Sequence, residues 1–161
     1  MALETVPASS GSDGRWRIAF TALADNPLSV ADLTGNDLTY SFTADGFDYQ
    51  TSQALAEDKR LTMIQNLERP GRTTESLTVT YVASTDAGSA DVVLTEGLEG
   101  HITIRRGVSA ATAWTAAQKA DVITFEAGVK RANAPTENGV DTITQQLFIT
   151  SPTLKAQTIV V

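Results

Sequence analysis

The chain has 161 residues, a length that suits one domain able to bury its own hydrophobic core. It contains no cysteine and a single histidine, which excludes disulfide scaffolds, cysteine-based zinc or redox sites and most histidine-centred metal sites. Nineteen acidic and twelve basic residues give a net charge of -7, the wrong sign for a protein that grips nucleic acid by neutralising phosphates.

Signals for export and membrane insertion are missing from the sequence. It has no run of about 18 apolar residues that could span a bilayer. Its start lacks the basic residues and apolar stretch of a signal peptide. We therefore expect a soluble protein that is made in a cytoplasm and has no membrane anchor.

Residues 1–14 are small and polar, and we expect them to form a flexible N-terminal arm. Such a segment either stays disordered or becomes ordered on a neighbouring molecule, and its composition favours neither outcome. Residues 15–161 are expected to form one β domain. Its first elements are a strand over residues 15–22, with Trp16, Ile18 and Phe20 on one face, and a one-turn helix from Ser29 to Gly35.

A first hairpin is predicted around Asp45 and Gly46. Leu38, Tyr40 and Phe42 alternate with polar residues before this dipeptide, and the alternation resumes beyond it at residues 47–49. Asp-Gly between two alternating stretches is a strong signal for a tight turn.

A second, longer hairpin is predicted over residues 60–84. Residues 52–59 are polar and favour a weak helix or a surface loop, and residues 60–67 favour a strand of mixed pattern. The sequence Arg-Pro-Gly-Arg at 69–72 has Pro and Gly where a type II turn needs them.

Residues 76–107 have the most regular pattern in the chain. Leu77, Val79 and Tyr81 alternate with threonines, which predicts a strand with one buried face. A short helix is predicted from Ser89, its N-cap, to Gly97, followed by a strand over 101–106.

The last third of the chain completes an all-β pattern. A broad loop at 108–117 with Trp114 as an aromatic anchor leads to strands at 121–131 and 141–150, separated by an exposed loop at 132–139. Residues 157–161 could pair as an edge strand. About eight short strands predict an all-β protein, a β-sandwich or barrel with one short flanking α-helix.

No motif for catalysis, nucleotide binding or calcium binding is present, so an enzyme is not expected and no catalytic, cofactor-binding or metal site is predicted. His101 is interpreted as a surface histidine rather than a general base. Two pairs of acids around glycines, Asp45 with Asp48 and Asp86 with Asp91, have too few ligands for calcium and fit turn and cap chemistry better.

Three pairs of basic residues stand at predicted strand ends: Lys59-Arg60, Arg105-Arg106 and Lys130-Arg131. Solvated strand ends and salt bridges to a neighbouring subunit explain them equally well.

Some predicted strand faces are polar but uncharged. One row is Thr39, Ser41 and Thr43; a second is Thr78 and Thr80 continued by Val82; Gln145 and Gln146 interrupt the late strand. Strand edges without lysine invite pairing with another chain. We therefore expect a protein that is covered by copies of itself.

The order of elements resembles the major tail (tail tube) proteins of long non-contractile-tailed bacteriophages. The resemblance rests on the Trp16 strand, the 39–49 and 60–84 hairpins, the Ser89–Gly97 helix, the strand from Ile102 to Arg106, and a late strand pair. Gln145 to Pro152 also looks like the final sheet strand of actinobacterial-phage members.

This resemblance implies hexameric rings whose inner sheets join into a β-lined channel and which stack into a tube. Stacking would involve residues 1–14, 52–74 and 156–161. The implied partners are the protein itself, the tape measure and tail terminator proteins, and viral DNA that passes through the lumen without specific binding. The implied location is the virion, after synthesis in the host bacterial cytoplasm, and the family has no catalytic residues or cofactors.

Two other classes stay open from the sequence. One is a phage capsid decoration or head-tail joining protein, or a tube protein of a secretion or contractile system, which would have a similar composition. The other is a carbohydrate-binding β-sandwich, which needs a cluster of exposed aromatic residues. Trp16 falls in a predicted core row and Trp114 stands alone in a loop, so that cluster is not evident.

Overall fold

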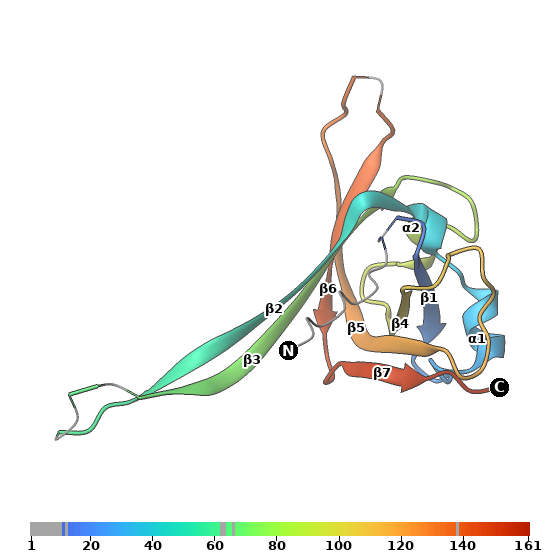
Figure 1. Cartoon of the computed structure of the whole chain (residues 1–161). Helices are drawn as coiled ribbons and strands as arrows, with labels where there is room; N and C mark the ends of the chain where they lie inside the picture. Colours follow the sequence, from blue (N-terminus) through green and yellow to red (C-terminus); the bar gives the residue numbers. More distant parts are fainter. Residues whose placement is uncertain (1–10, 12, 62–63, 66, 138) are drawn as a thin grey trace, which may run out of the picture.

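The computed structural model describes residues 11, 13–61, 64–65, 67–137 and 139–161. Its strands belong to one antiparallel sheet in the order β1-β4-β5-β6-β3-β2, with β7 paired to β5 (Figure 1). The strands are β1 (Trp16–Ala22), β2 (Phe42–Asp58), β3 (Leu67–Val82), β4 (Glu99–Arg106), β5 (Lys119–Ala132), β6 (Thr142–Ile149) and β7 (Leu154–Thr158). The helices are α1 (Val30–Gly35), the 3₁₀ turn η1 (Thr39–Ser41) and α2 (Ala90–Val93). The all-β prediction is confirmed.

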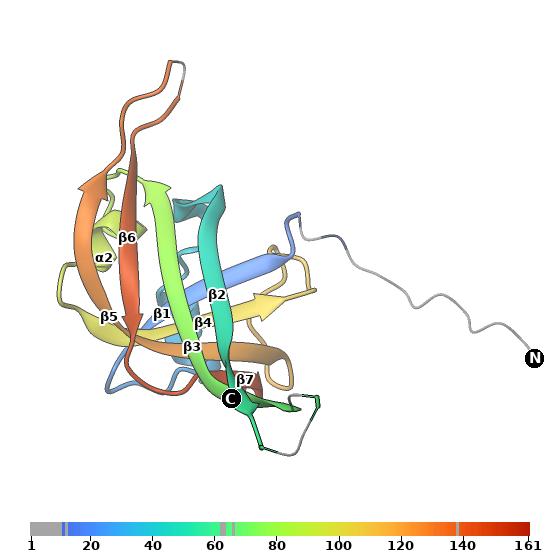
Figure 2. The same cartoon turned by 90° about the vertical axis from the view of Figure 1, so that its left-hand side faces the viewer.

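The sheet bends at β5 and so forms two layers. Residues 121–126 of β5 pair with β4, whereas the part from Phe125 onward pairs with β6. A register shift between Ala127 and Lys130 marks the end of the bend. In Figure 2, β2, β3 and β6 run side by side in one layer, and β1 and β4 cross behind them. This is the predicted sandwich.

The main hydrophobic core lies between the two layers. Alternate residues of the facing strands are buried there, including Ile18, Leu77, Val79, Ile102 and Phe125. The helix α2 contributes Ala90 and Leu94 to the same core, and its predicted N-cap is confirmed because the Ser89 hydroxyl accepts a hydrogen bond from the Val92 amide at 3.4 Å. The helix ends at Val93, earlier than the predicted Gly97.

A second, smaller core lies on the other face of β1, β4 and β5. Ala19, Leu33, Trp114, Ala120 and Ile159 are buried there, beneath α1 and the 108–117 loop. The predicted helix after Ser29 and the predicted anchoring of the loop by Trp114 are therefore confirmed. Both faces of this layer are covered, which explains why β4 buries polar residues as well as apolar ones.

The predicted turn at Asp45-Gly46 is wrong, because β2 runs through it without a break. The residues before it form η1, and the pairing of β2 with β3 shifts between Phe42 and Phe47. A Cβ atom on Gly46 would lie 2.1 Å from the Thr80 carbonyl oxygen. Glycine is needed here because two strands approach closely at an irregularity, not because the chain reverses.

The predicted hairpin over residues 60–84 is also wrong. Residues 52–58, expected as a helix or loop, are part of β2, and the Arg69–Arg72 stretch, expected as a turn, is part of β3. Pro70 pairs with Leu55 next to a second register shift, where a strand tolerates the missing amide hydrogen. The chain reverses between Asp58 and Leu67 instead, so the described residues among 60–66 lie outside both strands.

The later strands follow the sequence more closely. β5 and β6 confirm the strands predicted at 121–131 and 141–150, and the described residues of the predicted 132–139 loop lie outside them except Ala132, which ends β5. The C-terminal strand is present but covers Leu154–Thr158 rather than 157–161. Residues 1–10 and 12 lie outside the described part, so the N-terminal arm stays a prediction.

Candidate assembly surfaces

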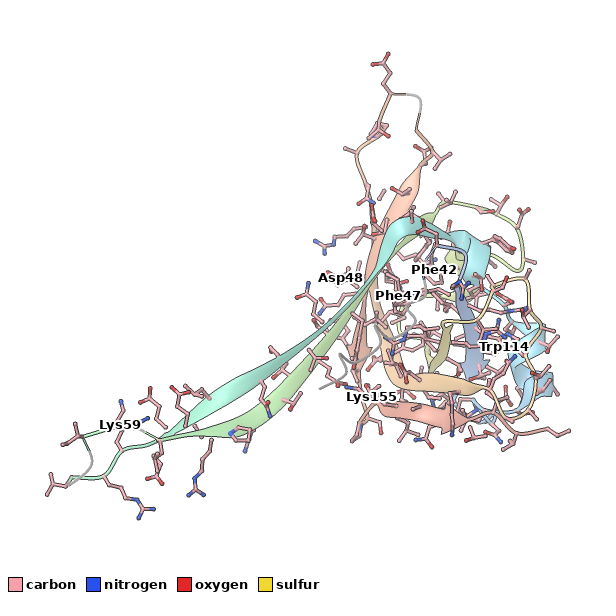
Figure 3. The ribbon with its side chains drawn as sticks, viewed as in Figure 1. Phe42, Phe47, Asp48, Lys59, Trp114 and Lys155 are labelled. Carbon is pink, nitrogen blue, oxygen red and sulfur yellow. The ribbon has the colours of Figure 1, made fainter. Side chains whose placement is uncertain are left out.

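The β2–β3 hairpin continues far beyond the body of the protein. β6 pairs with β3 only between Leu77 and Val82, so from there outward β2 and β3 pair with one another alone. Figures 1 and 3 show this two-stranded extension leaving the sandwich, with Lys59 near its far end. We call residues 52–74 the hairpin arm. A hairpin of this kind is marginally stable in water without a packing partner.

Apolar side chains of the hairpin arm are open to solvent. Leu55 is 58% exposed, and Leu61 and Ile64 at the tip are 105% and 107% exposed. Apolar side chains this free of contacts are typical of a surface that another molecule covers. Leu55, Leu61 and Ile64 were not predicted as a surface site, although apolar residues within a polar stretch that lacks core periodicity were an available signal.

Ion pairs near the tip stay within the arm. Arg60 and Arg69 lie 3.2 and 3.7 Å from the carboxylate of Asp58, and Lys59 pairs with Glu57. These pairs are exposed, so each contributes little to stability.

The root of the arm is fixed to the turn between β6 and β7. Thr153 Oγ1 donates a 2.5 Å hydrogen bond to Glu75, and Lys155 Nζ lies 3.5 Å from the same carboxylate (Figure 3 labels Lys155). The hydrogen bond from Thr153 has the largest effect on the pKa of Glu75 and lowers it, while burial of the carboxyl acts in the opposite direction. The arm therefore leaves the body at a defined angle.

The outward face of the β5-β6-β3-β2 layer has a strip of uncharged polar residues on β3 and β6, flanked by the charged side chains of Asp48 on β2 and Arg131 on β5. Thr78, Thr80 and Val82 of β3 lie opposite Gln146, Thr144 and Thr142 of β6. The hydroxyls of Thr80 and Thr144 are 2.9 Å apart, and Asn133 hydrogen-bonds to Thr142 and Thr144. Figure 3 places Asp48 on this side of the sheet, opposite Phe42 and Phe47. The polar row predicted on residues 78–82 is confirmed.

The other predicted polar rows are only partly confirmed. Thr39 and Ser41 lie in η1 and make local bonds: the Thr39 hydroxyl donates to Asp37, and the Ser41 hydroxyl accepts from the Ala90 amide at 3.1 Å. Gln145 faces the core, where it accepts a 3.0 Å hydrogen bond from the Tyr81 hydroxyl.

The same layer has a free strand edge at each side. β2 ends the sheet order, and beyond Ala127 the described part of β5 pairs with β6 alone, although Glu96 Oε1 accepts a 2.9 Å hydrogen bond from the Lys130 amide on that edge. Val129 on that edge is 69% exposed. The edge strand β1 of the other layer is covered, because Leu38 N donates to the Ile18 carbonyl at 2.9 Å and Phe20 N to the Asn36 carbonyl at 3.0 Å. Long open edges favour pairing with another chain.

Arg105, predicted at a solvated strand end or a subunit salt bridge, is fully buried instead. Its guanidinium donates hydrogen bonds to the carbonyls of Ser109, Thr112 and Ala113 and lies 5.0 Å from the centre of the Trp114 ring. Burial has the largest effect on the pKa of Arg105 and lowers it, and the nearby charge of Arg17 acts in the same direction. Arg105 therefore holds the 108–117 loop in place.

The other predicted basic pairs divide between exposed and bound residues. Arg106 pairs with Asp121 at the surface, and Lys130 Nζ binds the Asp91 carboxylate at 2.9 Å. Burial of the Asp91 carboxyl opposes its ionisation, but hydrogen bonds from Lys130 and from the Ser84 amide outweigh this effect and lower the pKa of Asp91. Asp91 therefore acts as a structural acceptor.

The remaining candidates for chemistry lie apart from one another. His101 is partly buried on β4, where its Nδ1 is 3.0 Å from the Thr124 hydroxyl. Asp48 accepts a 2.9 Å hydrogen bond from Gln50. Among the described residues there is no group of three or more His, Cys, Asp or Glu side chains that could hold a metal ion. Nor does any described helix have the length and hydropathy needed to cross a bilayer.

The described residues define a class of all-β protein: a sandwich with open strand edges on one layer and a projecting two-stranded arm. A sequence model of the phage tail tube protein family matches residues 4–161, so the chain belongs to that family. It is therefore a structural component of phage tails, and the resemblance found in the sequence is confirmed at this level.

A solved structure shares the fold. A chain in the cryo-EM structure of the anti-feeding prophage (AFP) baseplate, 6-fold symmetrised, superposes with a TM-score of 0.61 over 96% of this chain and 99% of that chain. The two sequences are 11% identical, so this likeness concerns the fold alone. No curated protein matches the sequence.

Proposed function

We propose that this protein forms hexameric rings that stack into the tail tube of a long non-contractile-tailed bacteriophage, the channel through which the genome is delivered. One observation carries the proposal: the β5-β6-β3-β2 layer has two open edges and extends into an arm whose apolar tip has no cover within the described residues. Neighbouring copies would cover both features: the open edges within a ring, and the tip of the arm between rings.

The open edges support ring formation. The β2 edge of one copy can pair with the β5 edge of the next, which is a head-to-tail contact, and such contacts close into a ring when the rotation allows it. The uncharged residues on the outward face of β3 and β6, which include Thr78, Thr80, Thr144 and Gln146, then form a continuous lining of the ring. The six-fold count comes from the family resemblance.

The lining suits the passage of viral DNA. The β3 and β6 strands present threonine and glutamine on the outward face, Asp48 and Arg131 flank them with one charge of each sign, and the chain as a whole carries a net charge of -7. Binding of DNA depends on neutralising its phosphates with basic residues, so this combination lets DNA slide without specific binding. Within the virion, the further partners would be the tape measure protein in the channel and the tail terminator protein at its end.

Among the three segments proposed for stacking, the arm at 52–74 has the strongest support. The C-terminal segment 156–161 is held within its own chain: Ile159 is buried, and its amide donates to the Gln118 carbonyl at 2.9 Å. The N-terminal segment 1–14 stays a proposal, since most of it lies outside the described residues.

A second candidate is a tube ring in a contractile or secretion-type particle. The fold shared with a chain of the anti-feeding prophage baseplate favours this candidate over capsid decoration or carbohydrate binding. The long arm and open edges serve either kind of tube.

Negative-stain electron microscopy of the purified, concentrated protein tests the proposal, with light scattering on the same sample. We expect stacked rings or tubes of uniform width, and growth of the scattering with concentration. Isolated rings would favour a joining or baseplate role, and a monomer at every concentration would count against self-assembly into a tube.

A further inference from the structure

A cavity of about 480 Å³ opens between the two strands that end the sheet, β1 and β2. Trp16 and Ile18 of β1 line one side, and Phe42, Ala44 and Phe47 of β2 line the other, with Tyr40 at the rim. Phe47 lies edge-on to both Trp16 and Phe42, with ring centres 6.0 and 5.8 Å apart. The cavity is therefore a rigid, aromatic-walled site, and its volume falls in the range of about 300–1,000 Å³ that is usual for binding pockets.

Tyr40 and Ala44 make the cavity accessible from outside. Tyr40 is 90% exposed, and Ala44 is exposed in the strand beside it. An exposed tyrosine above an apolar cavity is typical of a site that awaits a partner's side chain.

The tip of the hairpin arm has the matching chemistry. Leu61 and Ile64 are fully exposed aliphatic side chains. Such side chains suit a cavity whose walls are the apolar rings of Trp16, Phe42 and Phe47. Charge supports the match. Residues 57–72 carry four of the twelve basic residues and three of the nineteen acidic ones, so this stretch has a net charge of +1 and the rest of the chain -8. On the cavity side, Asp13 is exposed in the lining, and exposed Asp45 follows the lining residue Ala44.

Tip and cavity stand at opposite ends of one strand. Phe42 begins β2 and Asp58 ends it, so the strand is 17 residues long; Figure 3 labels Phe42 in the body and Lys59 at the far end of the arm. At about 3.3 Å per residue such a strand spans roughly 55 Å, so the tip cannot reach the cavity of its own chain. A contact between opposite ends of identical molecules produces an open filament when the rotation between them does not close into a ring.

We propose that the cavity lined by Trp16, Phe42 and Phe47 receives Leu61 and Ile64 of the hairpin arm from a second copy of this chain in the adjacent ring. The proposal rests on the function proposed above and assigns the receiving site for its stacking contact. It gives the exposed tip a partner and gives the cavity an occupant.

The absence of cysteine permits a direct test by cross-linking. Two single-cysteine variants, Ile64→Cys and Tyr40→Cys, are mixed, concentrated and treated with a short bismaleimide. We expect a cross-linked dimer of the two variants. Leu23→Cys is the matched control: Leu23 is also exposed but lies in the turn after β1, away from the cavity, and we expect it not to cross-link to Ile64→Cys.

Substitutions give an independent measure. Ile64→Asp and Tyr40→Asp each raise the protein concentration needed for stacking by about tenfold or more, as expected for central contacts of an interface, while the conservative Ile64→Leu keeps the wild-type value. Both aspartate sites are exposed, so circular dichroism of the variants should match the wild type.

The outcomes separate this proposal from the function on which it rests. If the wild type forms tubes but Ile64→Cys and Tyr40→Cys do not cross-link, the docking site is overturned and the tube function stands. If Tyr40→Cys cross-links instead to Leu3→Cys, the cavity belongs to the N-terminal segment and the proposal is likewise overturned. Failure of the wild type to stack contradicts both.

Discussion

Ser52 of β2 and Thr74 of β3 lie opposite one another in the antiparallel pair, at the point where the hairpin leaves the body. Every later pair of this hairpin, as far as Asp58 and Leu67, belongs to the arm. Of the described arm residues, none belongs to either hydrophobic core. The arm and the sandwich are therefore separable in energy, although they share two strands.

Removal of the arm should abolish stacking without unfolding the protein. The variant replaces residues 53–73 by Asn-Gly, a dipeptide that suits a two-residue hairpin turn. We expect a change in the free energy of unfolding of less than about 1 kcal/mol, because no core contact is lost. Urea denaturation and electron microscopy check the two effects. Tubes of normal length from this variant would refute the role of the arm.

Arg105 and Arg106 are adjacent in sequence and should differ sharply in their contribution to stability. Arg105→Met leaves several loop carbonyls without their buried donor and should lower the free energy of unfolding by about 3 kcal/mol. Arg106→Met removes only an exposed ion pair with Asp121 and should cost less than about 1 kcal/mol. Equal losses in urea denaturation would contradict the account of the 108–117 loop.

Gly46 should not tolerate even an added methyl group. In Gly46→Ala the Cβ atom would come within 2.1 Å of the Thr80 carbonyl oxygen and 2.4 Å of the Thr43 hydroxyl. We expect a loss of about 2 kcal/mol, since the two strands must move apart. Gly88→Ala is the control, because nothing lies within 4 Å of a Cβ at that position. A thermal unfolding curve unchanged in Gly46→Ala would show that the strands do not approach so closely.

Glu75 should make stability at the root of the arm depend on pH. Its folded pKa is lowered from 4.5, so its contribution is present above about pH 5 and is lost as the pH falls through the lower, folded value. The difference in unfolding free energy between wild type and Glu75→Gln should therefore be constant from pH 7 to about 5 and shrink below that. Urea titrations across this range measure it, and a difference that grows on acidification would reverse the assigned sign.

The strands of the body could be predicted because each places its large apolar side chains on one face, the face of the main core. Ile102 and Ile104 alternate with polar neighbours on β4, and the same period marks β1 and β3. Alternation reports burial, so it identifies strands whose two faces meet different surroundings.

The arm could not be predicted because it lacks that difference. Residues 52–57 are exposed on both faces of β2, so their sequence shows no alternation of apolar and polar residues. They form a strand because they pair with β3. The dipeptide Asp45-Gly46 misled for a related reason: glycine marks both tight turns and close strand contacts, and only the tertiary structure distinguishes them.

Arg105 was misjudged because adjacent arginines look alike in sequence. On β4, Thr103 and Arg105 share the face opposite Ile102 and Ile104, and that face is buried by α1 and the 108–117 loop. The alternation along β4 was the signal that could have distinguished the two arginines. Arg105 lies on the same face as Thr103, whereas Arg106 is the last residue of the strand.

The central claim is that the β5-β6-β3-β2 layers of neighbouring copies join around a channel. A cryo-EM reconstruction of the assembled protein tests it most directly. The account predicts six copies per ring, with β2 of each copy paired to β5 of the next and with Thr78, Thr80 and Thr144 facing the lumen. A tube in which this threonine face points outward, or in which the edges of β2 and β5 remain unpaired, would contradict it.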